Sequence, residues 1–178
     1  MLRSKPGGAY KDAVRYVLRV LSRRWRVLND EVRTLDAMIA SYVLATAPEL
    51  LERPGIGPEV ASTLLVAAGD NPERMKSEAS FAAMCGASPV DASSGRQRRH
   101  RLNRAGNRDA NRALWVIAFT RMRCDERTIN YTARRRQQGL TRREILRCLK
   151  RYIAREIFAL LRLQGSLLNK IEQMTLDT

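Results

Sequence analysis

The sequence predicts an all-α protein in which a long N-terminal helix precedes a compact helical domain. Three observations support this fold class. Apolar residues follow a heptad pattern over 14–42, a Gly- and Pro-containing turn separates two apolar segments near residue 55, and a capping-box spacing begins a helix at Thr141. We expect a lead-in at 1–10, a coiled-coil helix at 11–47, a helical domain at 48–163 and a tail at 164–178.

The N-terminal helix is predicted by a segment, 12–46, that contains neither Gly nor Pro. Its apolar residues are separated by alternating steps of four and three, which is the heptad seam of a coiled coil. The seam consists of Val14, Leu18, Leu21, Trp25, Leu28, Val32, Leu35, Ile39 and Tyr42. We expect it to pair with a second copy of the chain. A helix that docks on its own domain is the alternative.

A tight turn follows at 54–58, where the sequence reads Pro-Gly-Ile-Gly-Pro. Glycine lets a backbone approach a ligand closely, and proline is well suited to the first position of a helix. The free N–H groups at that helix N-terminus can hold a phosphate. The sequence therefore predicts a helix-hairpin-helix at 50–69 that contacts nucleic acid at Gly55 and Gly57. An ordinary helix-turn-helix corner is the alternative.

The composition points to a polyanionic partner. There are 33 Lys and Arg residues against 18 Asp and Glu residues, which gives a formal net charge of +15. Nucleic acid fits this charge better than an anionic membrane surface, because no helix combines a basic face with one rich in Trp and Phe. No apolar segment is long enough to span a bilayer and no signal peptide precedes the first helix, so we expect a cytoplasmic, nucleoid-associated protein.

Two features of the composition argue against particular kinds of site in this chain. Three cysteines without paired spacing exclude a disulfide framework. A single histidine argues against His-based zinc sites and Ser-His-Asp hydrolysis. We expect no metal site within this chain.

A basic loop is predicted at 86–106. No acidic residue occurs between Asp91 and Asp109. Guanidinium groups bind phosphate through paired hydrogen bonds, so this region is a candidate nucleic-acid contact. The residues expected to bind are Arg96, Arg98, Arg99, Arg101, Arg104, Asn107, Arg108 and Arg112. A solvated charged loop is the alternative.

Two serines, Ser93 and Ser94, precede Gly95 and the arginines. Phosphoryl transfer requires positioning and positive charge around the phosphate, and the arginines meet the second need. A serine here could attack a DNA phosphate. Serines in turns are common, however, so composition alone favours no role for them.

These segments together resemble a known family. The sequence over 80–115, preceded by the Pro-Gly-Ile-Gly turn, resembles the C-terminal transposase domain of the insertion sequence one-hundred-ten family, the bridge-RNA-guided serine transposases. The similarity extends over about 53–161, and the heptad helix matches the family's coiled-coil connector. The specific positions are the turn, the Ser-Gly run, and Arg104, Gly106, Asn107, Ala113 and Leu114.

The resemblance implies a function and a partner list. Ser94 would be the recombination nucleophile, with Ser93 close enough to be mistaken for it, and the partners would be DNA and a guide RNA. Family members also carry an N-terminal nuclease-like domain in which acidic residues hold Mg²⁺. Only about ten residues precede the heptad helix here, so we expect a truncated transposase or a fragment whose magnesium site lies in the missing domain.

Three helices are predicted in the C-terminal part of the chain. The first covers 107–123, with Arg108, Arg112 and Arg121 away from its apolar face and Cys124 buried at its end. The second ends near Gly139. The third begins at Thr141 and has a basic surface that includes Lys150, and it frays after about Gln164.

Three functions remain open from the sequence. The first is a DNA transposase or recombinase domain that supplies a serine nucleophile. The second is a truncated, inactive module that binds nucleic acid and dimerises. The third is a structural adaptor whose coiled coil is its function.

Overall fold

The computed structural model describes residues 7–69, 75–88, 90–91, 100–101, 103 and 106–176. The chain divides into two compact units, Met1–Ser41 and Tyr42–Thr178.

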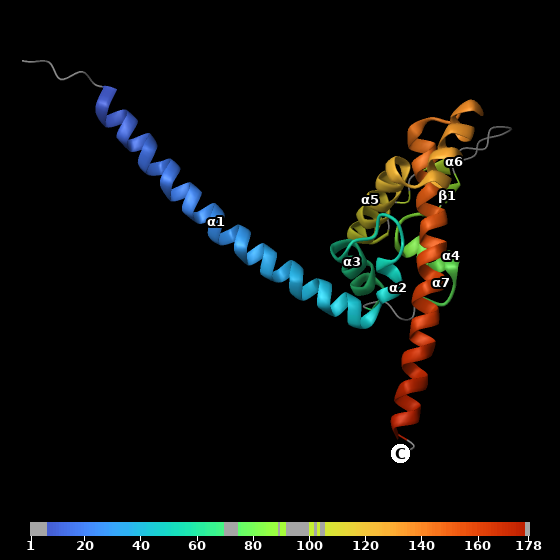
Figure 1. Ribbon diagram of the computed structural model, residues 1–178. Coiled ribbons are helices and arrows are strands. Elements are labelled where there is room, and N and C mark those ends of the chain that lie inside the picture. Colours follow the sequence, from blue (N-terminus) through green and yellow to red (C-terminus); the bar gives the residue numbers. More distant parts are fainter. Residues whose placement is uncertain are drawn as a thin grey trace, which may run out of the picture. The chain divides into compact units, whose positions relative to one another are not determined.

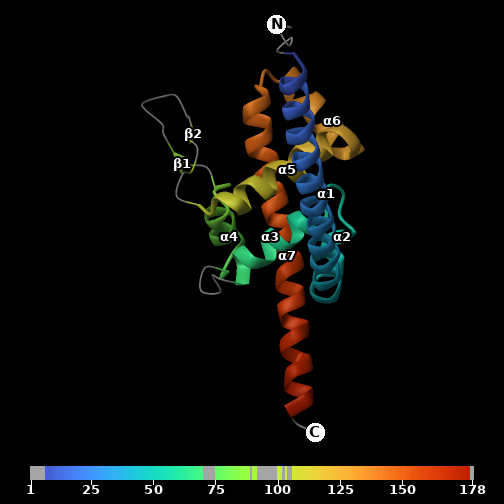
Figure 2. The same cartoon turned by 90° about the vertical axis from the view of Figure 1, so that its left-hand side faces the viewer.

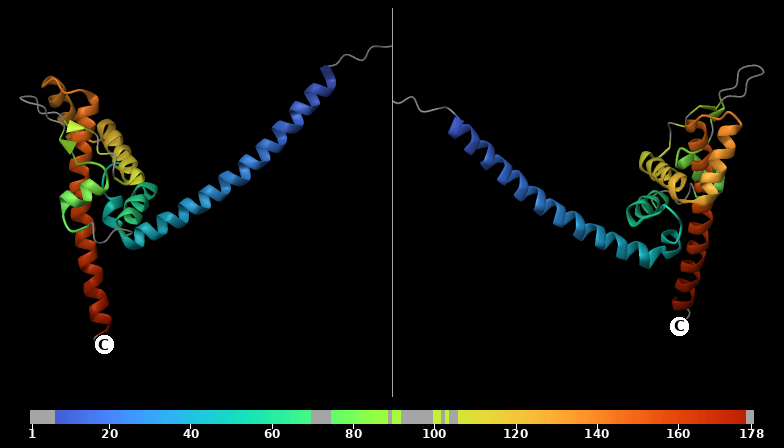
Figure 3. Two further views of the ribbon diagram at one scale, coloured as in Figure 1. Left: turned by 180° about the vertical axis from the view of Figure 1, so that it is seen from behind. Right: turned by 45° about the horizontal axis from the view of Figure 1, so that its top comes forward.

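The first unit is formed by most of α1 (Gly7–Thr46), which is one uninterrupted helix (Figure 3). Seven seam residues from Val14 to Leu35 have between 39% and 66% of their surface exposed. Apolar side chains at heptad spacing that remain exposed are available to another helix. A long helix is present as predicted, but it begins at Gly7, within the predicted lead-in, and its coiled-coil pairing stays a prediction.

The second unit contains six helices in its described part. They are α2 (Pro48–Leu51), α3 (Pro58–Gly69), α4 (Glu78–Met84), α5 (Arg108–Cys124), α6 (Glu126–Gln137) and α7 (Arg142–Leu176). Helix α7 runs alongside α4 and α5, and α3 packs against the same α5 (Figures 1 and 2). Two strands of two residues each, β1 (Val90–Asp91) and β2 (His100–Arg101), pair in antiparallel fashion. The all-α prediction is confirmed.

The core of this unit is apolar and centred on α5 and α7. Fully buried side chains include Leu64 from α3, Phe81 from α4, Leu114 and Ile117 from α5, and Ile157 from α7. The rings of Phe81 and Phe158 lie 6.0 Å apart. Helix α5 contacts α3, α6 and α7, and so lies at the centre of this packing.

Side-chain caps define where three helices begin. Asn107 Oδ1 accepts hydrogen bonds from the backbone N–H groups of Asp109 and Ala110 at the start of α5. Asp125 caps α6 by accepting hydrogen bonds from the hydroxyl and the backbone N–H of Thr128, and the hydroxyl bond above all lowers the pKa of Asp125 below its ordinary value. At α7 the predicted capping box is formed, because Glu144 accepts hydrogen bonds from the backbone and hydroxyl of Thr141. These bonds also lower the pKa of Glu144.

Two helix ends differ from the predictions. Cys124 is exposed rather than buried, because it is the last residue of α5, and the chain turns there into the Asp125 cap. Helix α7 continues to Leu176, whereas the sequence predicted a fraying tail from 164. Leucine and isoleucine at 167, 168 and 171 continue the helical spacing of apolar residues past Gly165.

Candidate nucleic-acid interface

The predicted turn between α2 and α3 is held closely against α5. Gly55 has a φ of 75°, a left-handed conformation that glycine adopts readily. A Cβ atom at this position would lie 3.2 Å from Thr120 Cβ and 3.3 Å from the carbonyl oxygen of Ile117. Gly55 is therefore required by both its conformation and its packing.

The other end of the turn faces open space. Gly57 is exposed and nothing lies within 4 Å of the position that a Cβ would take. Its carbonyl accepts the first helical hydrogen bond of α3, from Ala61 N. Pro58 begins that helix, as predicted, and the N–H groups of its first turn have no partner within the helix. The turn thus presents backbone donors beside Gly57, although Glu59 places a carboxylate in the same turn.

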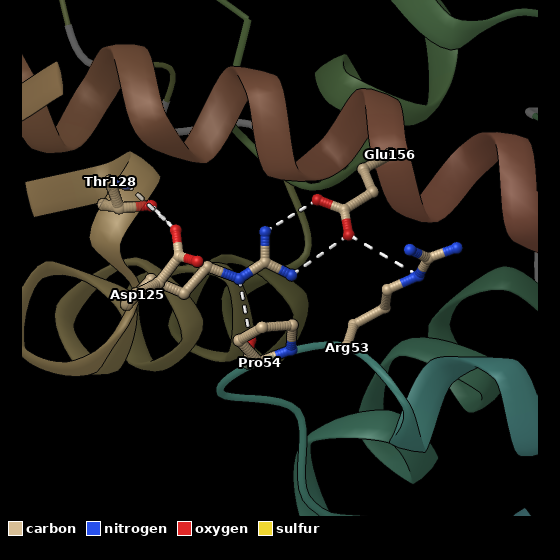
Figure 4. Close-up of polar contacts among 6 residues, drawn as sticks. Arg53, Pro54, Asp125, Thr128 and Glu156 are labelled. Carbon is tan, nitrogen blue, oxygen red and sulfur yellow. Dashed lines mark hydrogen bonds and ion pairs between the residues drawn. The ribbon is translucent and has the colours of Figure 1, made fainter. Parts of the chain in front are cut away.

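A buried arginine anchors this turn to two helices (Figure 4). Arg121 on α5 is 8% exposed. Its Nε donates to the carbonyl oxygen of Pro54 at 2.7 Å, and its two terminal nitrogens donate to the carboxylate of Glu156 on α7 at 2.7 and 3.2 Å. Arg53, also on the turn, lies 3.9 Å from the same carboxylate. This arrangement corrects the prediction that Arg121 lies away from the apolar face of its helix, because its side chain is buried with that face.

The two ends of the basic loop are fixed to each other and to α5. Gly86 has a φ of 63°, and a Cβ on Gly106 would overlap the backbone of Gly86. The backbone N–H of Asn107 donates to the carbonyl oxygen of Met84 at 2.6 Å. Asn103 Nδ2 donates to the carbonyl oxygen of Ala83 at 3.3 Å. The chain therefore enters and leaves the loop at one place.

A second buried cation supports these loop ends from α7. Lys150 is 6% exposed, and its Nζ donates to Asn111 Oδ1 at 2.8 Å. Asn111 Nδ2 in turn donates to the carbonyl oxygen of Cys85 at 2.8 Å. Burial, followed by the charge of Arg147, lowers the pKa of Lys150 below its ordinary value. Lys150 was predicted to belong to a basic helix surface, and its burial is a correction.

Neighbouring residues of α7 reach the same region. Arg151 Nη1 donates to Ser88 Oγ at 3.2 Å, and Arg155 Nε donates to Glu78 Oε1 at 2.6 Å. These contacts tie α7 to α4 and to the beginning of the loop.

The predicted binding residues are only partly described. Asn107 is the cap of α5, and Arg108 and Arg112 are exposed on its first turns. Arg101 lies in β2, where its backbone alone is described. Ser93, Ser94, Arg96, Arg98, Arg99 and Arg104 lie outside the described residues. The pairing of Asp91 with His100 brings the two ends of the 92–99 segment together.

Helix α5 connects the two candidate contacts. Its N-terminal end holds the loop ends through Asn107 and Asn111, and its C-terminal half holds the turn through Thr120 and Arg121. At 1.5 Å per residue these two attachments are about 15 Å apart along the helix. Both contacts are therefore placed by one rigid element.

The described residues provide no metal site and no membrane span. No group of three His, Cys, Asp or Glu side chains comes together within the ranges given above. No helix in this part of the chain carries an apolar stretch that could cross a bilayer. The magnesium that the family resemblance implies has no fitting ligands among these side chains.

Comparison with known proteins identifies the family of this domain. Residues 47–133 match the model of a family described as "Transposase IS116/IS110/IS902 family". The "Insertion element IS110 uncharacterized 43.6 kDa protein" of Streptomyces coelicolor is 33% identical over 138 residues, which cover 76% of this chain and 34% of that protein. The chain thus spans about a third of the length of this curated relative. The anchored turn, both loop ends and most of α6 all fall inside the matched range, and residues 47–133 of this chain are a transposase domain of the IS116/IS110/IS902 family.

Proposed function

We propose that this chain binds DNA through its 42–178 unit and supplies Ser94 as the nucleophile for strand exchange in transposition. The observation that carries the proposal is the fixation of both ends of the basic loop on α5, within a transposase domain. Because its two ends are fixed at one place on the helices, the segment between them would present its hydroxyl and guanidinium groups beside α5.

The chemistry is a transesterification at phosphorus. Ser94 Oγ gives up its proton and forms an O–P bond, while the bond from phosphorus to a deoxyribose oxygen breaks and that oxygen takes up a proton. The arginines from Arg96 to Arg104 would neutralise the phosphate, and Gly55, Gly57, Arg108 and Arg112 would hold the flanking backbone. Asn107 would place Arg108 by capping α5.

The proposed partners are DNA, a guide RNA and a second copy of the chain. Homo-oligomerisation through 14–42 is supported by the exposure of the heptad seam. Any magnesium would be held by an acidic domain outside the residues described here.

A second candidate is a module that binds nucleic acid and dimerises without catalysing strand transfer. The exposed seam on α1 supports it, because a chain that pairs through this surface would dimerise whether or not it is catalytic.

One experiment separates these functions. Ser94→Ala and Ser93→Ala variants are incubated with a DNA substrate and a separately supplied acidic nuclease-like domain, and covalent protein–DNA adducts are trapped on denaturing gels. The adduct should disappear in Ser94→Ala and persist in Ser93→Ala. Retained adduct in Ser94→Ala overturns the assignment of the nucleophile. Absence of any adduct, with salt-sensitive DNA binding preserved, favours the binding module.

A further inference from the structure

Helix α5 carries a pair of stacked aromatic rings, of which Trp115 is exposed and Phe119 is half-buried. Trp115 is 44% exposed. Its ring stacks on Phe119, with centroids 5.0 Å apart and planes inclined by only 13°. Within the described residues, Trp115 has no second ring partner and no guanidinium over its ring. A large flat π surface is therefore presented to solvent.

Guanidinium groups surround this pair. Arg123 lies 6.0 Å from the Phe119 centroid and Arg142 lies 5.4 Å from it. On the other side of Trp115 along the helix, Arg112 and Arg108 are both exposed. The flanks of the aromatic pair are cationic in both directions.

These side chains form one line on the helix, which we call the α5 stripe. At 100° per residue its five members fall within an arc of about 80°, and they extend over about 22 Å. The stripe consists of Arg108, Arg112, Trp115, Phe119 and Arg123. The opposite face of α5 is the buried one, which includes Leu114, Ile117 and Arg121. The stripe is therefore an outward surface of a helix that is fixed in the core.

A second aromatic cluster with an exposed ring has a different geometry. Tyr131 and Tyr152 meet edge to face, with planes at 83°, and Arg134 and Arg135 lie 5.7 and 5.9 Å from the Tyr131 centroid. Tyr152 is more exposed than Trp115, at 54%, but it has no parallel ring beneath it. This cluster is a natural control for exposure without a stacked platform.

We propose that the α5 stripe binds unpaired bases of a DNA strand, with a base stacked on Trp115 and the neighbouring phosphates held by Arg112 and Arg123. The inference rests on the proposed function and goes further, because it assigns a site for single-stranded DNA beside the strand-exchange loop. Aromatic rings flanked by cations are the surfaces on which single-stranded nucleic acid stacks.

The placement of the stripe favours DNA near the point of strand exchange. The stripe begins at Arg108, one residue after the cap that holds the end of the basic loop. Strand exchange separates bases next to the broken phosphodiester, and a base in an intact duplex keeps both faces stacked. Unpaired DNA is therefore the ligand that this position would meet.

Fluorescence provides a direct test, because the chain has only two tryptophans, Trp25 and Trp115. In a Trp25→Phe variant all tryptophan emission comes from Trp115. A short single-stranded DNA should quench this emission, because a stacked base quenches indole, whereas a duplex of the same length should bind with little quenching. Trp115→Ala should weaken single-strand binding about tenfold and leave duplex affinity within about twofold.

The controls distinguish the possible failures. Tyr152→Ala should change neither affinity, and Trp115→Phe should retain most single-strand binding. Binding of single-stranded DNA without quenching of Trp115 overturns the stripe but leaves the proposed function intact. Stronger quenching by RNA of the same sequence overturns the assignment to DNA. If the Trp115 emission is quenched by raising the protein concentration without DNA, the stripe is a protein interface instead. Absence of any nucleic-acid binding overturns both proposals.

Discussion

The two tryptophans of this chain are both exposed, but they lie on very different helices. Trp25 is 66% exposed in the middle of the α1 seam, among aliphatic residues at heptad spacing. Trp115 is 44% exposed on α5, stacked on Phe119 and flanked by arginines. Helix α5 packs its other face into the core, whereas none of the described side chains of residues 7–41 on α1 is buried.

The difference shows that the neighbours of an exposed aromatic residue indicate its partner better than its exposure does. Aliphatic neighbours at heptad spacing fit another helix. Planar and cationic neighbours fit bases and phosphates. Of the substitutions on these two helices, only those on the inner face of α5 should lower the free energy of unfolding strongly.

The largest effect is expected on that inner face. Arg121→Ala leaves Glu156 without its main partner and removes the donor to Pro54, so the free energy of unfolding should fall by about 3 kcal/mol. Urea denaturation followed by circular dichroism measures this fall in the free energy of unfolding. Leu28→Ala on α1 should leave the unfolding transition of the 42–178 unit unchanged. An equal loss in the two variants would contradict the comparison.

The Arg121 prediction has a matched control. Replacing the whole pair, as Arg121→Met with Glu156→Leu, removes the uncompensated charge and should recover most of the lost stability. Failure to recover would show that the hydrogen bond to Pro54 contributes more than the ion pair.

A smaller effect is expected on α1. Leu28→Asp places a charge in the heptad seam and should weaken self-association by about 2 kcal/mol per chain, because an apolar side chain is no longer buried between helices. Light scattering at several concentrations measures the mass. If the parent protein and the Leu28→Asp variant have the same mass in solution, the seam has another role.

The smallest effect is expected at the junction of α5 and α6. Asp125→Ala removes the α6 cap and should cost about 1 kcal/mol. The folded state lowers the pKa of Asp125 from 3.8, so this contribution is complete at pH values above 3.8 and declines as the pH falls through the lowered value. Unfolding measured across this range should show the parent and variant converging in acid. Asp125→Asn keeps the acceptor and should remain stable in acid relative to Asp125→Ala.

Much of the fold was predictable because local signals determine helix ends. The stop near Gly139 and the Thr141–Glu144 box appear where the sequence placed them, and α5 begins within one residue of its predicted start, with Asn107 as its cap. The exposure of the α1 seam agrees with its heptad pattern, although that pattern does not identify the partner that would pack on the seam.

The candidate site was less predictable, because two of its cations are buried. Arg121 and Lys150 lie among apolar residues at helical spacing, and a pattern that counts arginine and lysine as surface residues cannot place them inside. Their partners, Pro54 and Asn111, are 67 and 39 residues away in sequence. The stacking of Trp115 on Phe119 had a signal, the i, i+4 spacing of two aromatic residues, that could have been recognised from sequence.

The close contact between Gly86 and Gly106 has a practical consequence for the chain that lies between them. Since the chain leaves and rejoins the scaffold at a single point, the cost of closing the intervening arm depends only weakly on the arm's length. Arms of other lengths and sequences could be grafted between these two glycines while the helices beneath keep their packing. The domain can therefore carry different arms on one unchanged helical base.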